Sequence, residues 1–261
     1  MNKKFYLLIL TFFSINSAVS QFDEEMSKTE LYDKAMDMNI YLQMLAKDKL
    51  FLINYTEKEL VSSEFDYALA KIVENLNDID INETNPKIIT QLDQIKKFWK
   101  KFNLKATQNL TLKNFTNFYF EVNTFDRLLS DLIEKMKENY QLPQNELKKY
   151  NEIQQLRKLI QKITLSYYAN NLNLSKSFMH QYKKDIQSVD QFIKQKSNLY
   201  LNDPSSENLF SDVIMDWSFL KTYLFRTKLD NIKTILSLSI SIDYKLKTIK
   251  NHYINTLNKG F

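Results

Sequence analysis

Glycine and proline are almost absent from this chain, and their scarcity is the strongest constraint on its fold. The 261 residues include one Gly and three Pro. A sheet-rich protein of this length needs many tight turns, and such turns draw heavily on both residues. Leu, Ile, Lys, Asn and Gln dominate instead, and an apolar fraction of 44% is sufficient for a packed core. The sequence therefore predicts an all-α fold of long helices joined by polar connections.

The first twenty residues have the features of a secretory signal peptide. Lys3 and Lys4 form a basic start, and an uncharged apolar run follows over residues 5–13. Ala18 and Ser20 then supply the small residues that a signal peptidase accepts. The run is shorter than the roughly 20 apolar residues of a membrane-spanning helix, although an uncleaved anchor is the alternative interpretation. We expect an exported protein, periplasmic or secreted, whose signal peptide covers residues 1–20.

The sequence lacks Cys, so an exported fold must be held together by burial without disulfides. Cleavage of the signal peptide removes two lysines and lowers the formal net charge from +5 by two. The remaining charge is too small to indicate nucleic-acid binding.

An internal repeat is the clearest long-range pattern. Trp99 and Trp217 lie thirteen residues after Pro86 and Pro204, respectively. An Asn or Asp precedes each proline, and such a pair typically begins a helix, because the first residue caps free amides and proline needs no amide partner. The same offset of 118 residues relates two further apolar pairs, Ile95 with Val213 and Phe102 with Leu220. We infer that each copy starts a helix at its proline and that these prolines and tryptophans anchor the repeat.

The repeat continues upstream at slightly smaller offsets. At an offset of 117, a set with the spacing of one helix face recurs: Phe65, Leu69, Ile72 and Leu76 match Tyr182, Ile186, Val189 and Ile193. At an offset of 114, Leu42 and Leu45 match Leu156 and Leu159. Small insertions in the connections between helices would produce this drift.

We therefore expect two four-helix units, over residues 21–142 and 143–261, divided near Pro143. The expected helices cover residues 27–56, 62–79, 86–105, 111–141, 145–172, 175–200, 204–222 and 226–258. Connections this short favour antiparallel neighbours, so the predicted architecture is a tandem of antiparallel four-helix bundles with about eight helices. The last helix carries an apolar stripe typical of a core seam. The sequence leaves the relative placement of the two units open.

The opening helix of each unit carries a segment that resembles a known family. The copies read Leu42-Gln43-Met44-Leu45-Ala46-Lys47 and Leu156-Arg157-Lys158-Leu159-Ile160-Gln161-Lys162. Both are similar to degenerate versions of G-R-Q-R-M-L-S-Q-R-M-A-K. That segment marks the PilJ-type N-terminal sensor domain of type IV pilus methyl-accepting chemotaxis transducers and the related NarX-like nitrate-sensor domains. The resemblance covers most of the mature chain and implies a periplasmic four-helix bundle that is often present twice.

The resemblance also implies an anion site. In the nitrate-sensor relatives, the Arg that matches Arg157 binds an anion across a dimer axis. A guanidinium suits this role because its planar donors can hold nitrate, carboxylate or phosphate through two contacts. The alternative is a solvated basic helix face around Lys158. The candidate ligand-binding residues are Arg157, Gln161 and Lys162 in the second unit and Gln43 and Lys47 in the first.

The sequence departs from the family in three respects. Both copies lack the family's Gly, and the first has Gln43 where Arg is usual and Lys47 where Gln is usual. Two equivalent anion sites are therefore not expected. Transducers also continue into a membrane helix and a cytoplasmic signalling region, which this sequence lacks, so we expect any signal to pass to another protein.

Signatures of an enzyme are missing from the sequence. The two histidines have no partner at ligand spacing, and the absence of Cys argues against a zinc site. A single Gly, at position 260, leaves no place for a nucleophile elbow or a Gly-rich phosphate loop. We therefore predict no catalytic residue, no metal site and no cofactor.

The signal peptide, the repeat and the Arg157 segment together lead to one functional hypothesis. The protein is expected to be an exported, sensor-like or interaction module that contacts a membrane receptor, a sensor kinase or a pilus component. A small anion as ligand and a homodimer are open alternatives within this hypothesis. The competing hypothesis is a structural scaffold or adhesin-like spacer without a ligand, in which Arg157 matters only for folding.

Overall fold

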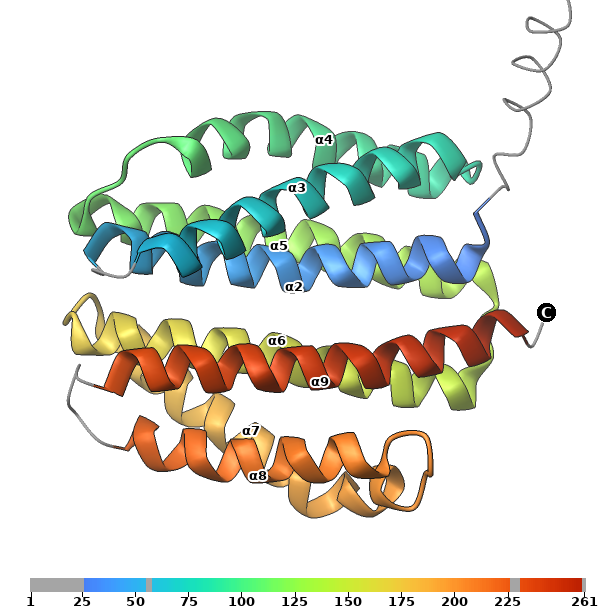
Figure 1. Ribbon diagram of the computed structural model, residues 1–261. Coiled ribbons are helices and arrows are strands. Elements are labelled where there is room, and N and C mark those ends of the chain that lie inside the picture. Colours follow the sequence, from blue (N-terminus) through green and yellow to red (C-terminus); the bar gives the residue numbers. More distant parts are fainter. Residues whose placement is uncertain (1–25, 55–57, 226–230, 260–261) are drawn as a thin grey trace, which may run out of the picture.

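The computed structural model describes residues 26–54, 58–225 and 231–259, and these ranges contain eight α-helices and no strand (Figure 1). The all-α prediction is confirmed. The expected signal peptide and the expected start of the last helix at residue 226 lie outside the described residues. The helices are α2 (Lys28–Asn54), α3 (Lys58–Asn82), α4 (Pro86–Thr107), α5 (Leu112–Tyr140), α6 (Gln144–Asn171), α7 (Lys176–Leu201), α8 (Glu207–Leu224) and α9 (Ile232–Lys259).

The two prolines of the repeat have different places relative to their helices. Pro86 is the first residue of α4, and Asn85 caps that helix by accepting a hydrogen bond from the Lys87 amide at 3.0 Å. The prediction for Pro204 was wrong, because α8 begins three residues later, at Glu207. Asp203 accepts from the Ser205 amide at 3.1 Å, which closes a turn around the proline before the helix starts.

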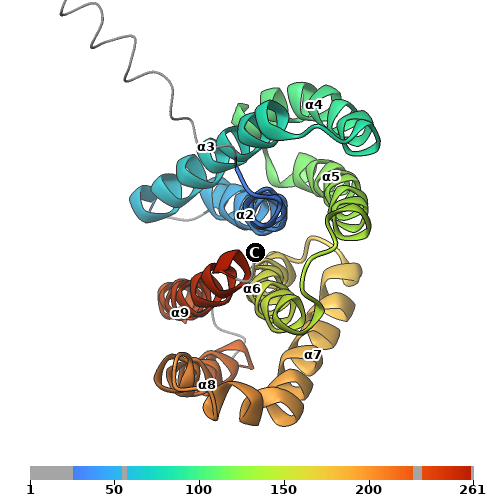
Figure 2. The ribbon, with the colours of Figure 1, turned by 90° about the vertical axis from the view of Figure 1, so that its right-hand side faces the viewer.

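The helices contact one another in the same order in both halves of the chain. In the first half, α2 packs on α3 and α5, and α4 packs on the same two helices. In the second half, α6 packs on α7 and α9, and α8 packs on the same two helices. Figure 2, viewed along the helices, shows one set above the other, with α2 of the first set facing α6 of the second. The contact pattern thus repeats helix for helix, as the sequence repeat does.

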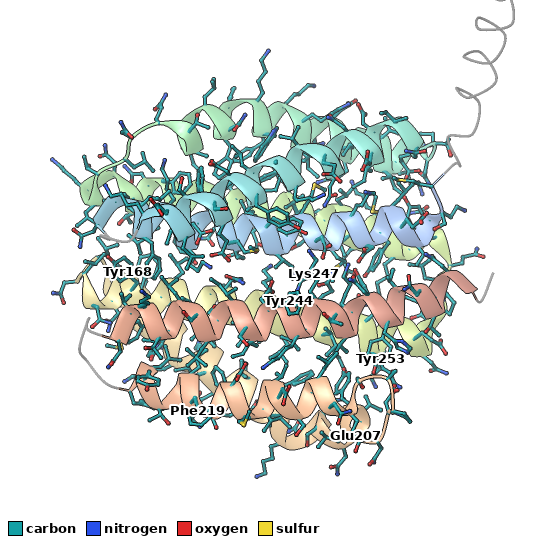
Figure 3. All side chains as sticks on the ribbon, viewed as in Figure 1. Tyr168, Glu207, Phe219, Tyr244, Lys247 and Tyr253 are labelled. Atoms are coloured by element: carbon teal, nitrogen blue, oxygen red, sulfur yellow. The ribbon has the colours of Figure 1, made fainter. Side chains whose placement is uncertain are left out.

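The two halves meet mainly through α2 and α6, which run parallel. Tyr32 lies against Tyr150 with ring centroids 6.1 Å apart, and Phe51 stacks on Tyr168 at 4.2 Å. Tyr168 is visible between the two helices at one end of the molecule in Figure 3. The same figure shows Lys247 of α9 directed toward the first half, where its Nζ donates to Tyr67 Oη of α3 at 3.0 Å. The two halves, whose relative placement the sequence left open, therefore lie side by side along their helices.

Helix α2 is buried on all sides along its middle. Every residue from Asp37 to Phe51 is buried, because α2 contacts α3, α5, α6 and α9. The buried stretch includes the polar residues Asn39, Gln43, Lys47 and Asp48. Polar and charged groups in such a position need partners inside the protein, since water cannot reach them.

The outer helices follow the simpler amphipathic pattern. The apolar stripe of α9 is buried as predicted: Ile232, Ile235, Leu236, Ser239, Ile242, Leu246, Ile249 and Tyr253. Trp99 and Trp217 are both buried in the core of their halves. Within the described ranges, no helix combines the length and the apolar character that crossing a bilayer requires.

Candidate functional site

Arg157 is fully buried and is held by two carboxylates from other helices. Its Nη1 donates to Asp37 Oδ1 of α2 at 2.9 Å and to Gln154 Oε1 at 2.8 Å. Its Nε and Nη2 donate to the two oxygens of Asp243 of α9, at 3.0 and 3.3 Å. Such a two-point contact is the strongest geometry for a guanidinium. An external anion at Arg157 would have to displace one of these carboxylates.

Lys250 of α9 extends the same cluster. Its Nζ contacts both oxygens of Asp33 at 2.8 Å and Asp37 Oδ2 at 3.2 Å. Tyr150 donates its hydroxyl to Asp33 Oδ1 at 2.6 Å, and Gln154 Nε2 donates to Asp37 Oδ1 at 2.9 Å. We call these residues the charge network: Asp33, Asp37, Gln154, Arg157, Asp243 and Lys250. It joins α2, α6 and α9.

The charge network contains three carboxylates and two cations. Burial would raise the pKa of Asp37, but Lys250 and Arg157 lower it to about 2. Burial raises the pKa of Asp33, the charge of Asp37 raises it further, and Lys250 opposes both effects. Asp37 is therefore firmly ionised, whereas Asp33, which shares Lys250 with it, takes up a proton more readily.

The first copy of the repeat has a smaller version of the Arg157 contact. Gln43 Nε2 donates to Asp126 Oδ1 of α5 at 3.1 Å. Gln43 matches Arg157 at the offset of 114, and Asp126 matches Asp243 at the offset of 117. In both halves the residue at this position of the repeat therefore reaches an aspartate of the closing helix. Sequence analysis missed the two aspartates, although the offset already found in α3 and α7 relates them.

The other predicted site residues are divided between the interior and the surface. Lys47 is fully buried and pairs with Glu64 at 2.9 Å and Asp48 at 3.3 Å. Gln161 is also buried, and its side-chain Oε1 and Nε2 have no hydrogen-bond partner among the described residues. Lys162 is only partly buried. Four of the five residues thus lie inside the protein, and Lys162 alone is open to a ligand.

A groove of about 490 Å³ lies where α2, α5 and α6 meet, and Lys162 forms part of its wall. We call it the polar groove. It is lined by Tyr32, Met36, Asn39, Ile40, Ser130, Ile133, Glu134, Lys137, Asn151, Gln154, Gln155, Lys158, Leu159 and Lys162. Its volume falls in the range typical of small-molecule sites.

The polar groove and the charge network share Gln154. This side chain lines the groove, yet it also accepts from Arg157 and donates to Asp37. Asn39 is a second buried amide in the groove wall, and its Oδ1 has no hydrogen-bond partner among the described residues. The groove therefore provides polar groups at its base and a direct contact with the network behind it.

Comparison with family models, curated proteins and solved structures found no match. In the described part of the chain, no group of three or more His, Asp or Glu side chains is placed to hold a metal ion.

Proposed function

We propose that this protein is an exported, non-enzymatic, sensor-like binding module built from two antiparallel four-helix bundles in tandem. The observation that carries the proposal is the position of Gln154 between the polar groove and the charge network. A ligand or partner segment that hydrogen-bonds Gln154 would compete with Asp37 and Arg157 for its amide. Occupancy of the groove would then alter the contacts that hold α2, α6 and α9 together.

The composition of the charge network also supports a binding role over a passive one. Buried ion pairs usually stabilise a protein no more than apolar residues of similar volume. Here three carboxylates share two buried cations, Arg157 and Lys250. A spacer without a ligand would be at least as stable with an apolar interior at these positions.

The scaffold hypothesis is the second candidate, and one observation favours it. The carboxylates of Asp37 and Asp243 occupy the donors of Arg157, and the pairing sets the register of α2 against α6. In that case Arg157 would serve folding alone. The sensor-like proposal instead requires that the signal pass to a membrane receptor, a sensor kinase or a pilus component.

The test is capture of partners from the cell envelope with tagged mature protein, residues 21–261, followed by mass spectrometry. Gln154→Met keeps the side-chain volume but removes the amide shared by the groove and the network. Gln91→Met is the matched control, because Gln91 is an equally buried glutamine of α4 outside both features, bonded to the Leu128 carbonyl and to Lys135.

The proposal expects the wild-type protein and Gln91→Met to capture the same receptor, kinase or pilus subunit, and Gln154→Met to capture several-fold less. Circular dichroism should show that all three proteins are folded. No reproducible partner, or equal capture by all three, would favour the scaffold.

A further inference from the structure

We infer that the polar groove binds a small organic acid that also carries a hydrogen-bond donor, such as a hydroxy acid or an amino acid. The inference rests on the proposed binding function and names the class of ligand for it. Two features of the groove lead to it: its charge and the state of its buried amides.

The charge of the groove favours an anion. Its wall carries three lysines, Lys137, Lys158 and Lys162, and one carboxylate, Glu134. The charge of Lys158 is neutralised by Asp126, whose Oδ1 lies 2.7 Å from its Nζ. Among the described residues, Lys137 pairs with Glu134 alone, at 3.8 Å, and this pair is weak because the Glu134 side chain is 65% exposed.

Lys162 is the cation best placed to receive a carboxylate. It forms no ion pair and donates no side-chain hydrogen bond to any described residue. Asp185 of α7 interacts with it electrostatically but makes no ion pair with it. Asp185 instead accepts from Gln181 at 2.7 Å. A ligand carboxylate at Lys162 would therefore compete with the attraction of Asp185 but would break no hydrogen-bonded ion pair.

The buried amides of the groove call for a donor on the same ligand. Asn39 is 6% exposed, and its Oδ1 has no hydrogen-bond partner among the described residues. A buried acceptor without a partner is unfavourable, because it has lost its hydrogen bond to water, and a ligand hydroxyl or ammonium group would supply a new one. Two other amides of the groove have partners: Asn151 Oδ1 accepts from Tyr32, and both polar atoms of Gln154 belong to the charge network.

The experiment is titration of isotope-labelled mature protein with pairs of acids that differ only by the donor. Malate is compared with succinate, and glutamate with glutarate, by amide chemical shifts and calorimetry at low ionic strength. The donor-bearing acid of each pair should bind about tenfold more tightly, with shifts at Asn39, Gln154 and Lys162.

Three variants locate the site. Lys162→Gln should weaken binding of all four acids about tenfold or more. Asn39→Leu should abolish the difference within each pair. Lys101→Gln is the control, because Lys101 is an exposed lysine of α4 outside the groove, and its loss should change nothing. If Asn39→Leu does not fold, the partly exposed Lys162 still gives a decisive variant.

Several outcomes would overturn the inference. Equal affinity within each pair of acids would show that the ligand needs no hydrogen-bond donor. An equal loss of affinity in Lys101→Gln and Lys162→Gln would show a general effect of charge. Absence of saturable binding would reject the ligand class. The proposed function is judged separately, because capture of an envelope partner that depends on Gln154 would stand even if no acid bound.

Discussion

At the position of Arg157, the two copies of the repeat make the same contact with different residues. Gln43 meets Asp126 through a neutral amide, whereas Arg157 meets Asp243 through a charge. The additional charge is balanced by Asp37, which belongs to the other half of the chain. The first copy has Gln43 where the second has Arg157, and only Arg157 of the two makes an ion pair with the other half of the chain, through Asp37.

We predict that Arg157→Gln, which copies the residue of the first half, lowers the free energy of unfolding by about 3–5 kcal/mol. The amide can still bond Asp243, but Asp37 loses one of its two cations and stays buried. Urea denaturation at neutral pH measures the change.

The double variant Arg157→Gln, Asp37→Asn is the control for the charge. It should recover a large part of the loss, because the buried charge of Asp37 is then removed together with its guanidinium partner, while the introduced amide can still bond Asp243. If Arg157→Gln lowers the free energy of unfolding by less than about 1 kcal/mol, Arg157 does not form a structural ion pair, and the hypothesis that it is an accessible ligand-binding residue is favoured again.

At the scale of single helices, the sequence identifies the buried side of a surface helix better than that of a central helix. Helix α9 contacts core on one side and its apolar stripe marks that side. Helix α2 is enclosed by four neighbours, so the polar residues between Asp37 and Phe51 are as buried as the apolar ones. Periodicity predicts the helix in both cases, but it identifies the buried side only where another side meets water.

Helix starts are local features, and we predict that their stability effects follow the capping contacts. Asn85→Ala should lower the free energy of unfolding by about 1 kcal/mol, because Asn85 bonds the Lys87 amide at the start of α4. Thr111 occupies the same position before α5 without a side-chain capping bond, so Thr111→Ala should change stability by less than about 0.5 kcal/mol. Urea denaturation compares the two, and equal losses would show that the caps are not responsible.

At the scale of the whole molecule, the two halves depend on each other through α2 and α6. The contact combines stacked aromatic rings, such as Phe51 and Tyr168, with ion pairs between Asp37 and the residues Arg157 and Lys250. Separation of the halves would expose both apolar rings and unpaired charges. Each half on its own would therefore lack the neighbours that cover its central helix, α2 or α6.

We predict that residues 21–142 expressed alone do not form a stable monomer, whereas the full mature chain unfolds in one cooperative transition. Thermal melts followed by circular dichroism and size-exclusion chromatography measure both. Mixing with residues 143–261 should restore helicity and a defined complex. A fragment that melts cooperatively near the temperature of the full chain would contradict this dependence.

The sequence alone determined the helical class, most helix boundaries and the repeat, because these rest on local periodicity, capping residues and spacing along the chain. It also singled out the Arg157 segment. Only the tertiary structure decided that Arg157 is enclosed by Asp37 and Asp243, and that Lys162 is the one predicted ligand-binding residue on the groove wall. These partners lie 120 and 86 residues from Arg157. Such pairs form where helices meet in space, and the periodicity of a single helix does not specify which neighbours will enclose it.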